Sequence, residues 1–390
     1  MKKKRSIVIL GSTGSIGTST LNVIKEKKSK FSIELLTANN NYKKLITQAK
    51  IFKPKNVLIK NKNYYLNVKN SLKKTKTKVY CGNISINNII SKKVDFTMAS
   101  IVGVAGLQPT LDSIRFSKTV AIANKEAIIC GWEILSKFIK KYKTKIYPVD
   151  SEHFSIFELT KGYTDDEIEE IIITASGGPF LKNKINSLNN VKPNQATKHP
   201  NWKMGKKISV DSANLMNKVF EVIEACKIFN FNENKYKVVI HPQSYIHSII
   251  RFKNGLIKMI LYNSDMKIPI SNILYEGKNF YPDVKTIDTK KLNQSSFFDV
   301  DIKKFPSVKL IKKCLNLGAS TPTIVNASNE VCVNMFLKGK ISFIDIVSII
   351  NKIFKDKEFK KYAKKKPNSI NNIKSVDKWA RLKTMTMCVR

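Results

Sequence analysis

Short apolar runs alternate with helical periodicity over the first 150 residues. The strand-like runs are SIVIL (6–10), SIELLTA (32–38), NVLI (56–59), DFTMASIVG (95–103), TVAIA (119–123) and KIYPVD (145–150). Alternation of this kind predicts β-α-β units, in which parallel strands form one doubly wound sheet. The sequence therefore predicts an α/β protein that begins with a Rossmann-like, doubly wound domain.

The rhythm changes after residue 150, where strand-like and helical stretches are mixed. Strands are expected within 169–180 and 237–252, and one long helix over 212–229. Glycine-ended helical patterns at 307–318 and 329–339 and a periodic stretch at 342–354 predict a small helical domain. The predicted organisation is a Rossmann-like domain at 1–150, an α+β domain at 151–285, a connector at 286–310 and a C-terminal α-helical domain at 311–390.

The charge balance is strongly basic, with 70 Lys and Arg against 29 Asp and Glu and a formal net charge of +41. Such a field attracts phosphates and nucleic acid. The lysines, however, are spread over the whole chain together with many asparagines and isoleucines, and no recognition-module signature accompanies them. We interpret them as a solvated surface that reflects a coding bias, and we expect no specific nucleic-acid partner.

Neither the start of the chain nor the cysteine pattern indicates export. The basic start MKKKR is followed by an apolar run that stops within a few residues, and no stretch is long enough for a transmembrane helix. The six cysteines, at 81, 130, 226, 314, 332 and 388, show neither C-x-x-C pairing nor metal-site spacing. Reduced thiols in a cytoplasmic protein without a membrane partner are therefore expected.

Three glycines, Gly11, Gly14 and Gly17, stand between the first expected strand and the first expected helix. At such a turn, backbone N–H groups and the helix dipole favour a pyrophosphate. The G-x-x-G-x-x-G spacing is longer in its first gap than the usual dinucleotide fingerprint, so a plain glycine-rich turn is the alternative. After the second strand, TANNNYKK (37–44) has amides and lysines in place of the acid that binds the ribose of NAD, which favours NADPH.

Two carboxylates flank a serine in VDSEHFSIFE (149–158). If KIYPVD is a strand, Asp150 and Glu152 point to one side of it, and converging carboxylates repel each other unless a cation or a proton lies between them. On its own, a D-x-E pair is more typical of an exposed strand end. The interpretation as a site therefore depends on further residues.

The helix expected over 212–229 supplies such residues. Asn217, Lys218 and Glu221 lie on neighbouring positions of one helix turn, and Ser212 lies near the expected helix start, where a hydroxyl and free backbone amides favour an anion. The loop TASGGPF (174–180) places Ser176 beside two glycines after a strand, a pattern typical of a phosphate loop and equally of a plain turn. One region thus combines carboxylates with anion donors.

The sequence resembles the 1-deoxy-D-xylulose 5-phosphate reductoisomerases over nearly all of its length. The motifs that carry the resemblance are GSTGSIG (11–17), ANKE (123–126), VDSEH (149–153), SGGPF (176–180), HPNWKMG (199–205), SVDSANLMNK (209–218) and HPQSYIHS (241–248). They occur in that family's order and at its spacing. Several long motifs in order are far more specific than any one of them.

The resemblance implies a role for each matching residue. One divalent cation, Mg²⁺, Mn²⁺ or Co²⁺, is expected on Asp150, Glu152 and Glu221, since hard cations prefer oxygen ligands. The expected catalytic or substrate-binding residues are Lys125, Ser151, Glu152, Ser176, His199, Trp202, Ser212, Asn217, Lys218 and Glu221. Among these, Ser176, Ser212, Asn217 and Lys218 would form the phosphate site with His199 close by, and Trp202 would belong to a mobile flap.

The expected NADPH contacts are Thr13, Gly14, Ser15, Ile16, Ala38, Asn39, Asn40, Asn124, Lys125, Glu126, Met204 and Gly205. The family often has a glycine where this chain reads ANNN (38–41), which is a departure at the adenosine end of the cofactor. Three further histidines, His153, His241 and His247, are interpreted as structural residues that support the site.

The implied reaction has two stages. A metal-assisted rearrangement of the phosphorylated sugar gives an aldehyde, and NADPH then reduces this aldehyde to 2-C-methyl-D-erythritol 4-phosphate for isoprenoid precursor synthesis. The resemblance also implies a homodimer. Two other hypotheses are weaker: an aspartate-semialdehyde type of dehydrogenase would need an activated cysteine, and no motif here suggests one. A nucleic-acid-binding protein built on a nucleotide fold would not need the acidic triad.

Overall fold

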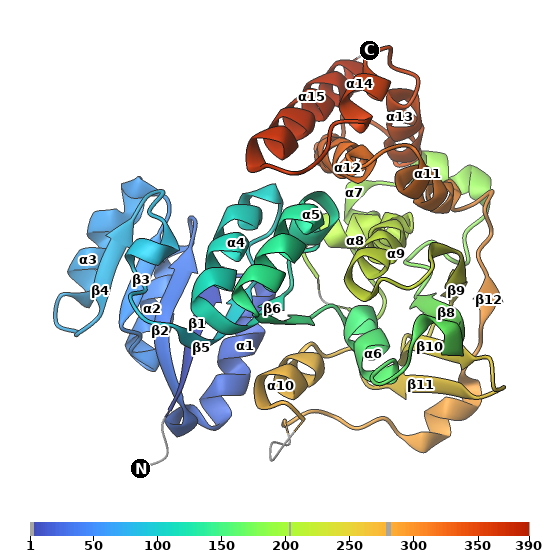
Figure 1. Ribbon diagram of the computed structural model, residues 1–390. Coiled ribbons are helices and arrows are strands. Elements are labelled where there is room, and N and C mark those ends of the chain that lie inside the picture. Colours follow the sequence, from blue (N-terminus) through green and yellow to red (C-terminus); the bar gives the residue numbers. More distant parts are fainter. Residues whose placement is uncertain (1–3, 203, 278–281, 390) are drawn as a thin grey trace. The chain divides into compact units, whose positions relative to one another are not determined.

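A seven-stranded parallel sheet forms the N-terminal part of the protein, with the strand order β4-β3-β2-β1-β5-β6-β7 (Figure 1). The computed structural model describes residues 4–202, 204–277 and 282–389. The strands are β1 (Arg5–Leu10), β2 (Phe31–Ala38), β3 (Asn56–Ile59), β4 (Lys78–Cys81), β5 (Val94–Ala99), β6 (Ser117–Ile122) and β7 (Lys145–Pro148). The order reverses beside β1, which pairs with β2 on one side and β5 on the other. Ligands of such sheets bind at the carboxyl ends of the strands around this point.

The helices that connect these strands are α1 (Ser15–Glu26), α2 (Tyr42–Phe52), α3 (Tyr65–Leu72), α4 (Leu107–Phe116) and α5 (Lys125–Tyr142). Figure 1 shows α4 and α5 on one face of the sheet. The inner strands bury most of their residues, and β3 buries all four, as expected for parallel strands that are covered on both faces. The predicted Rossmann-like sheet is confirmed, and β4 is a seventh strand that was not predicted.

Two compact units make up the chain. The first contains the residues up to Ala127, Leu135–Phe154 and Met266–Val284, and the second contains Ile128–Ile134, Ser155–Asp265 and the residues from Lys285 onward. In the first unit, α10 (Lys267–Tyr275) packs on α1. The predicted domain boundaries at 150, 285 and 310 stay predictions.

The second unit contains a five-stranded sheet of order β11-β10-β8-β9-β12. Its strands are β8 (Ile168–Ala175), β9 (Tyr236–Ile240), β10 (Ile246–Phe252), β11 (Ile257–Leu261) and β12 (Phe298–Asp299). Within this sheet, as far as its residues are described, β8 and β9 pair in parallel and the other neighbours pair antiparallel. Helices α6 (Ser151–Leu159), α7 (Pro193–Ala196), α8 (Lys206–Ala213) and α9 (Met216–Phe229) accompany it. The core unites α6, α9 and the sheet through Ile156, Val222, Ile171 and Ile250.

The end of the chain is helical, as predicted. It consists of α11 (Leu310–Asn316), α12 (Thr321–Leu337), α13 (Asp345–Ile353), α14 (Phe359–Ala363) and α15 (Ile370–Cys388). Helices α13 and α15 pack on α12 and on each other around residues such as Ile324, Ile353 and Trp379. Helix α12 begins earlier than the predicted pattern at 329, because buried Thr and Asn side chains interrupt its apolar periodicity.

The single helix predicted over 212–229 is wrong, since two helices occupy this stretch. Helix α8 ends at Ala213 and α9 begins at Met216, with Leu215 between them in the left-handed conformation (φ 59°). The side chain of Asn214 accepts a hydrogen bond from the backbone N–H of Met216 at 3.0 Å, and this bond satisfies one of the free amides of the new helix. Ser212 therefore lies in the last turn of α8 and not at the start of α9.

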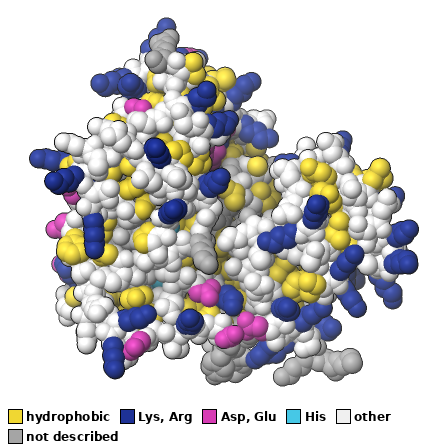
Figure 2. Space-filling view, turned by 180° about the vertical axis from the view of Figure 1, so that it is seen from behind, with side chains coloured by type: hydrophobic (Ala, Val, Ile, Leu, Met, Phe, Trp, Pro, Cys, Tyr) yellow, Lys and Arg dark blue, Asp and Glu magenta, His cyan; other side chains and the backbone are white. Residues whose placement is uncertain are grey.

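Lys and Arg side chains are dispersed over the face seen in Figure 2, as the sequence indicated.

Within the described ranges, no helix is both long enough and apolar enough to cross a membrane.

Candidate active site

Three carboxylates meet at the beginning of α6 and in α9. One oxygen atom each of Asp150, Glu152 and Glu221 lies within 4.8 Å of the other two. The route to this geometry differs from the expectation, because β7 ends at Pro148 and Glu152 lies in the first turn of α6. The expectation that Asp150 and Glu152 extend from one face of a strand is therefore wrong. Instead, Asp150 Oδ1 accepts the backbone N–H of Glu152 at 3.2 Å, as a helix-capping carboxylate does.

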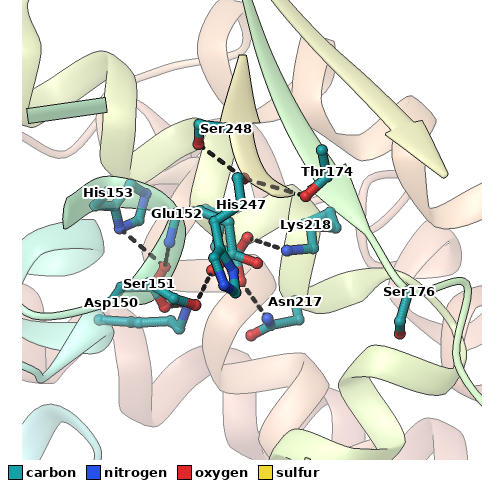
Figure 3. A network of polar contacts seen from close by, with 12 residues as sticks. Asp150, Ser151, Glu152, His153, Thr174, Ser176, Asn217, Lys218, His247 and Ser248 are labelled. Carbon is teal, nitrogen blue, oxygen red and sulfur yellow. Dashed lines mark hydrogen bonds and ion pairs between the residues drawn. The ribbon is translucent and has the colours of Figure 1, made fainter. Parts of the chain in front are cut away.

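Ammonium groups already balance two of these carboxylates. Lys125 Nζ lies 2.5 Å from Asp150 Oδ2, and Lys218 Nζ lies 2.6 Å from Glu221 Oε2. Glu221 is only 1% exposed, and Asn217 donates to its other oxygen (Figure 3). Carboxylates this close repel each other unless positive charge is present, and an all-oxygen donor set suits a hard divalent cation. The residues present therefore fit such an ion.

His153 and Ser151 support the carboxylates from α6 (Figure 3). The imidazole of His153 is fully buried, and its Nδ1 lies 3.5 Å from Asp150 Oδ1. The hydroxyl of Ser151 donates to Glu152 Oε2. Groups that orient metal-binding carboxylates act in this manner, and the structural role expected for His153 stays a prediction.

The loop after β8 carries Ser176 against the end of α8. Ser176 Oγ accepts the backbone N–H of Gly178 at 3.1 Å and lies 2.9 Å from His199 Nε2. Gly178 has φ +67°, and a Cβ there would lie 2.8 Å from Ala213 Cα and 2.9 Å from the carbonyl oxygen of Ser212. Only glycine permits this approach, so the sequence SGGPF brings Ser176 close to Ser212.

His199 is fixed in one tautomer when neutral. Its Nδ1 accepts the backbone N–H groups of Asn201 at 3.1 Å and Trp202 at 3.0 Å. The proton of the neutral ring therefore lies on Nε2, which faces Ser176 Oγ. An Nε2–H beside a serine hydroxyl is a suitable donor pair for an anion.

The segment 199–205 is anchored at its start. Asn201 donates to the carbonyl oxygen of Pro242 at 2.8 Å, and the Trp202 ring stands edge-on to His247 at 6.0 Å. His247 is buried and packs on Tyr262 at 4.0 Å. Lys203, within the flap motif, lies outside the described residues.

His241 is held by the connector, a contact that the sequence did not indicate. Its Nδ1 donates to the carbonyl oxygen of Ser296 at 3.1 Å, its Nε2 accepts the N–H of Tyr245 at 3.2 Å, and its ring stacks on Phe297. Burial lowers the pKa of His241 below its usual value. Both nitrogens of this neutral ring are used in these contacts, and the structural role expected for His241 stays a prediction.

The glycine turn and the end of β2, from which NADPH contacts are expected, both belong to the first unit. Gly17 packs so closely on the turn that a Cβ would lie 2.6 Å from Ser12 Cα. Asn39 and Asn40 are exposed directly after β2. Glu34 pairs with Lys55 at 2.9 Å on the surface of the sheet, away from the strand end. The end of β2 thus offers amides and no carboxylate among its described residues.

Asn124 organises the next loop of this end. Its side-chain oxygen accepts the N–H of Ala127 at 2.8 Å and caps α5. Its amide donates to the carbonyl oxygens of Ile101 and Gly103, the latter at 3.0 Å. The motif ANKE thereby fixes the loop after β5 and places Lys125 in the first turn of α5, where it reaches Asp150.

Two residues near the site were missed by the sequence reasoning. Asp211 in α8 is buried and accepts a hydrogen bond from the buried Asn329 in α12. A polar residue inside a helical pattern usually lies at the surface. The sequence therefore gives no sign that these two residues are buried.

A doubly wound sheet with a glycine turn, together with carboxylates beside anion donors, defines the class of nucleotide-dependent oxidoreductases that use a divalent cation. Residues 7–131 match 1-deoxy-D-xylulose 5-phosphate reductoisomerase, residues 146–229 its C-terminal domain, and residues 261–383 the DXP reductoisomerase C-terminal domain. The chain belongs to the 1-deoxy-D-xylulose 5-phosphate reductoisomerase family.

Individual members of this family are similar to nearly the whole chain. The reductoisomerase of Pelagibacter ubique is 46% identical over 387 residues, which are 99% of this chain and 100% of that protein. The enzyme from Zymomonas mobilis, solved in complex with NADPH, is 35% identical with a TM-score of 0.91 over 99% of both chains. A DOX-P reductoisomerase in complex with NADPH, fosmidomycin and magnesium is 32% identical, with a TM-score of 0.93 over 98% of both chains.

Proposed function

We propose that the residues described above carry the reaction of this family. The protein converts 1-deoxy-D-xylulose 5-phosphate to 2-C-methyl-D-erythritol 4-phosphate with NADPH and a divalent metal ion. The cation is held by Asp150, Glu152 and Glu221. The observation that carries this assignment is the approach of their three carboxylate oxygens to within 4.8 Å.

A divalent cation at this position supplies Lewis acidity to the carbonyl and hydroxyl oxygens of the substrate. The chain supplies orientation around it. Lys125, with its ammonium beside Asp150, and Ser151 contact the sugar oxygens nearest the carboxylates. His153 keeps Asp150 in place, so the ligand set is organised before the substrate binds.

The substrate phosphate binds at the start of α9 and at the Ser176 loop. Its donors are Ser176, His199, Ser212, Asn217 and Lys218. Asn217 and Lys218 lie in the first turn of α9, where free N–H groups and the helix dipole favour an anion. An anchor remote from the reacting carbons contributes binding energy that orients the sugar and raises the turnover rate.

Trp202 covers the substrate from segment 199–205 and excludes water from the reacting carbons. NADPH supplies the hydride. Its contacts are the glycine-turn residues Thr13, Gly14, Ser15 and Ile16, the end of β2 with Ala38, Asn39 and Asn40, the ANKE residues Asn124, Lys125 and Glu126, and the flap residues Met204 and Gly205. The amides at the end of β2 select the 2′-phosphate over a free ribose hydroxyl.

The protein works as a homodimer in the cytoplasm. Strand β11 is an edge of its sheet and exposes the apolar side chains of Ile257 (55%) and Met259 (43%), and Leu256 (54%) is exposed directly before it. An apolar edge strand favours association with a second copy. The six free cysteines suit a reducing compartment.

The decisive experiment follows the oxidation of NADPH by the purified protein through its absorbance. Oxidation is expected only with both 1-deoxy-D-xylulose 5-phosphate and a divalent cation, and a strong chelator should stop it. Excess Mg²⁺ should then restore the rate. Turnover that survives the chelator would remove the metal role from the carboxylates.

A further inference from the structure

A buried carboxylate joins two helices of the second unit. Asp211 in α8 is 1% exposed, and its Oδ1 accepts a hydrogen bond of 2.8 Å from Asn329 Nδ2 in α12. Its Oδ2 lies 3.1 Å from Lys207 Nζ, one turn earlier in α8. Asn329 is fully buried. A buried charge persists only when it is paired and hydrogen-bonded, so these contacts are specific and costly to remove.

Helix α8 depends on such contacts for its position. It has eight residues, and a helix this short has little stability of its own. Its contacts with neighbouring helices therefore decide where it lies. Asp211 fixes one side to α12, and Lys207 lies over the ring of Phe220 in α9 at 5.3 Å. The two members of the Asp211–Lys207 ion pair thus connect the short helix to α12 and to α9.

The end of α8 is part of the proposed phosphate site. Ser212 directly follows Asp211, and the backbone of Ser212 and Ala213 lies against Gly178 of the Ser176 loop. A shift of α8 therefore moves Ser212 and removes the surface on which the Ser176 loop rests. Position errors of this kind weaken binding even when the displaced group never touches the reacting atoms.

We propose that Asp211 and Asn329 are positioning residues for the substrate phosphate. They act through α8, which carries Ser212 and supports the Ser176 loop, and neither touches the substrate. The inference rests on the proposed phosphate role of Ser212. It also gives α12, in the C-terminal helical segment, a part in substrate binding.

The test compares two neighbouring buried positions of α12. Asn329→Leu keeps the side-chain size but removes the donor to Asp211. We expect it to raise KM for 1-deoxy-D-xylulose 5-phosphate about tenfold, with a smaller fall in kcat, because mispositioned ground-state contacts are lost. The Kd for NADPH, measured by fluorescence, should not change.

Ser328→Ala is the matched control. Ser328 is equally buried, but its hydroxyl bonds to Thr384 of α15 at 2.9 Å and not to α8. It should lower thermal stability without raising KM. An equal rise of KM in Ser328→Ala, or an unchanged KM in Asn329→Leu, overturns the positioning role.

An exchange of the two groups provides a second measurement. Asn329→Asp places two carboxylates together and should raise KM more than Asn329→Leu does. Adding Asp211→Asn restores one amide and one carboxylate, and KM should return to within about threefold of the wild type. Absence of this rescue contradicts the proposal. Ser212→Ala is assayed in parallel, because an unchanged KM there would refute the phosphate assignment itself.

Discussion

Lys218 and Glu221 form a buried ion pair in the first turns of α9, with Nζ 2.6 Å from Oε2. The pair places an ammonium group, which suits a phosphate, one turn from a carboxylate, which suits a metal ion. One helix end therefore serves both halves of the proposed substrate site. Because its members are buried and coupled, changes to either should affect binding far more than changes to surface charges.

Glu221→Gln should strongly reduce metal-dependent turnover. The variant keeps the shape of the side chain but removes one negative ligand, so Mn²⁺ binding measured by titration calorimetry should weaken by about tenfold to a hundredfold. Turnover at saturating Mg²⁺ should fall at least as far. Circular dichroism should show that the fold is retained.

Glu158→Gln is the control for this variant. It removes a carboxylate at the far end of α6 that pairs with Lys161 at 2.7 Å on the surface. Mn²⁺ affinity should be unchanged. Comparable loss in both variants would indicate a general charge effect and would exclude Glu221 as a specific ligand.

Gly178→Ala should disturb the proposed phosphate loop around Ser176. The new methyl group meets the backbone of Ser212 and Ala213, which cannot move aside as a flexible side chain can. We expect a loss of about 2 to 4 kcal/mol in unfolding free energy, or a displaced loop with a raised substrate KM. Thermal denaturation and steady-state kinetics measure the two outcomes.

Gly255→Ala separates backbone strain from contact. Gly255 has φ +87°, but a Cβ there meets nothing within 4 Å. Its cost should be about 1 kcal/mol with an unchanged KM. If the two variants behave alike, the close approach of Gly178 to α8 has no importance for substrate binding.

The sheet could be predicted from the sequence because its strands are buried on both faces. Continuous apolar runs mark such strands directly, as in β1 and β3. Strand β4 was not predicted because it lies at the sheet edge, is short and is only partly buried. The break between α8 and α9 was not predicted either. It depends on the left-handed backbone conformation of Leu215, which a leucine side chain does not indicate.

The site was predicted from motifs and from the family resemblance, not from local geometry. The helical placement of Glu152 differs from the expected strand end, although the carboxylates still meet. The connections of Asp211 with Asn329 and of His241 with Ser296 join segments far apart in the chain. No local pattern encodes such contacts, because each partner alone has the character of an ordinary polar residue.

Asp95→Asn should lower stability in a pH-dependent manner. Asp95 joins the starts of β1, β5 and β6 through Ser6, whose N–H and hydroxyl donate at 2.9 and 2.8 Å, and through Lys118 at 2.8 Å. Partial burial by itself raises the pKa of Asp95, but the hydrogen bonds from Lys118 and Ser6 outweigh this effect. Together they lower the pKa of Asp95 from 3.8 to about 2. The folded state therefore favours the carboxylate.

The sign of the effect follows from this lowered pKa. The stabilisation is present above the unfolded pKa of about 4 and is lost as the pH falls through the folded value. After allowance for solvent screening, Asp95→Asn should cost about 1 kcal/mol near pH 7. Urea denaturation should show this gap shrinking as the pH falls from about 5 to about 2. A gap that does not depend on pH would contradict the assignment.

Met259→Lys should dissociate the proposed dimer. The substitution places a charge on the exposed apolar edge of β11, where edge strands that avoid association commonly carry lysine. Light scattering after size-exclusion chromatography should give a mass near the 44.4 kDa of one chain. Leu66→Lys, at another exposed apolar side chain, is the control and should remain dimeric. A wild-type protein that is monomeric would refute the proposal directly.

Asn39→Asp should shift the cofactor preference from NADPH toward NADH. Asn39 is exposed directly after β2, where a carboxylate accepts the ribose hydroxyls of NADH and repels a 2′-phosphate. We expect the Kd for NADPH to rise about tenfold or more and the NADH affinity to improve, both measured by fluorescence titration. Glu34→Gln is the control, because Glu34 is a carboxylate of the same strand that pairs with Lys55 on the sheet surface. If Glu34→Gln changes the preference and Asn39→Asp does not, the ribose site lies on the strand face and not at its end.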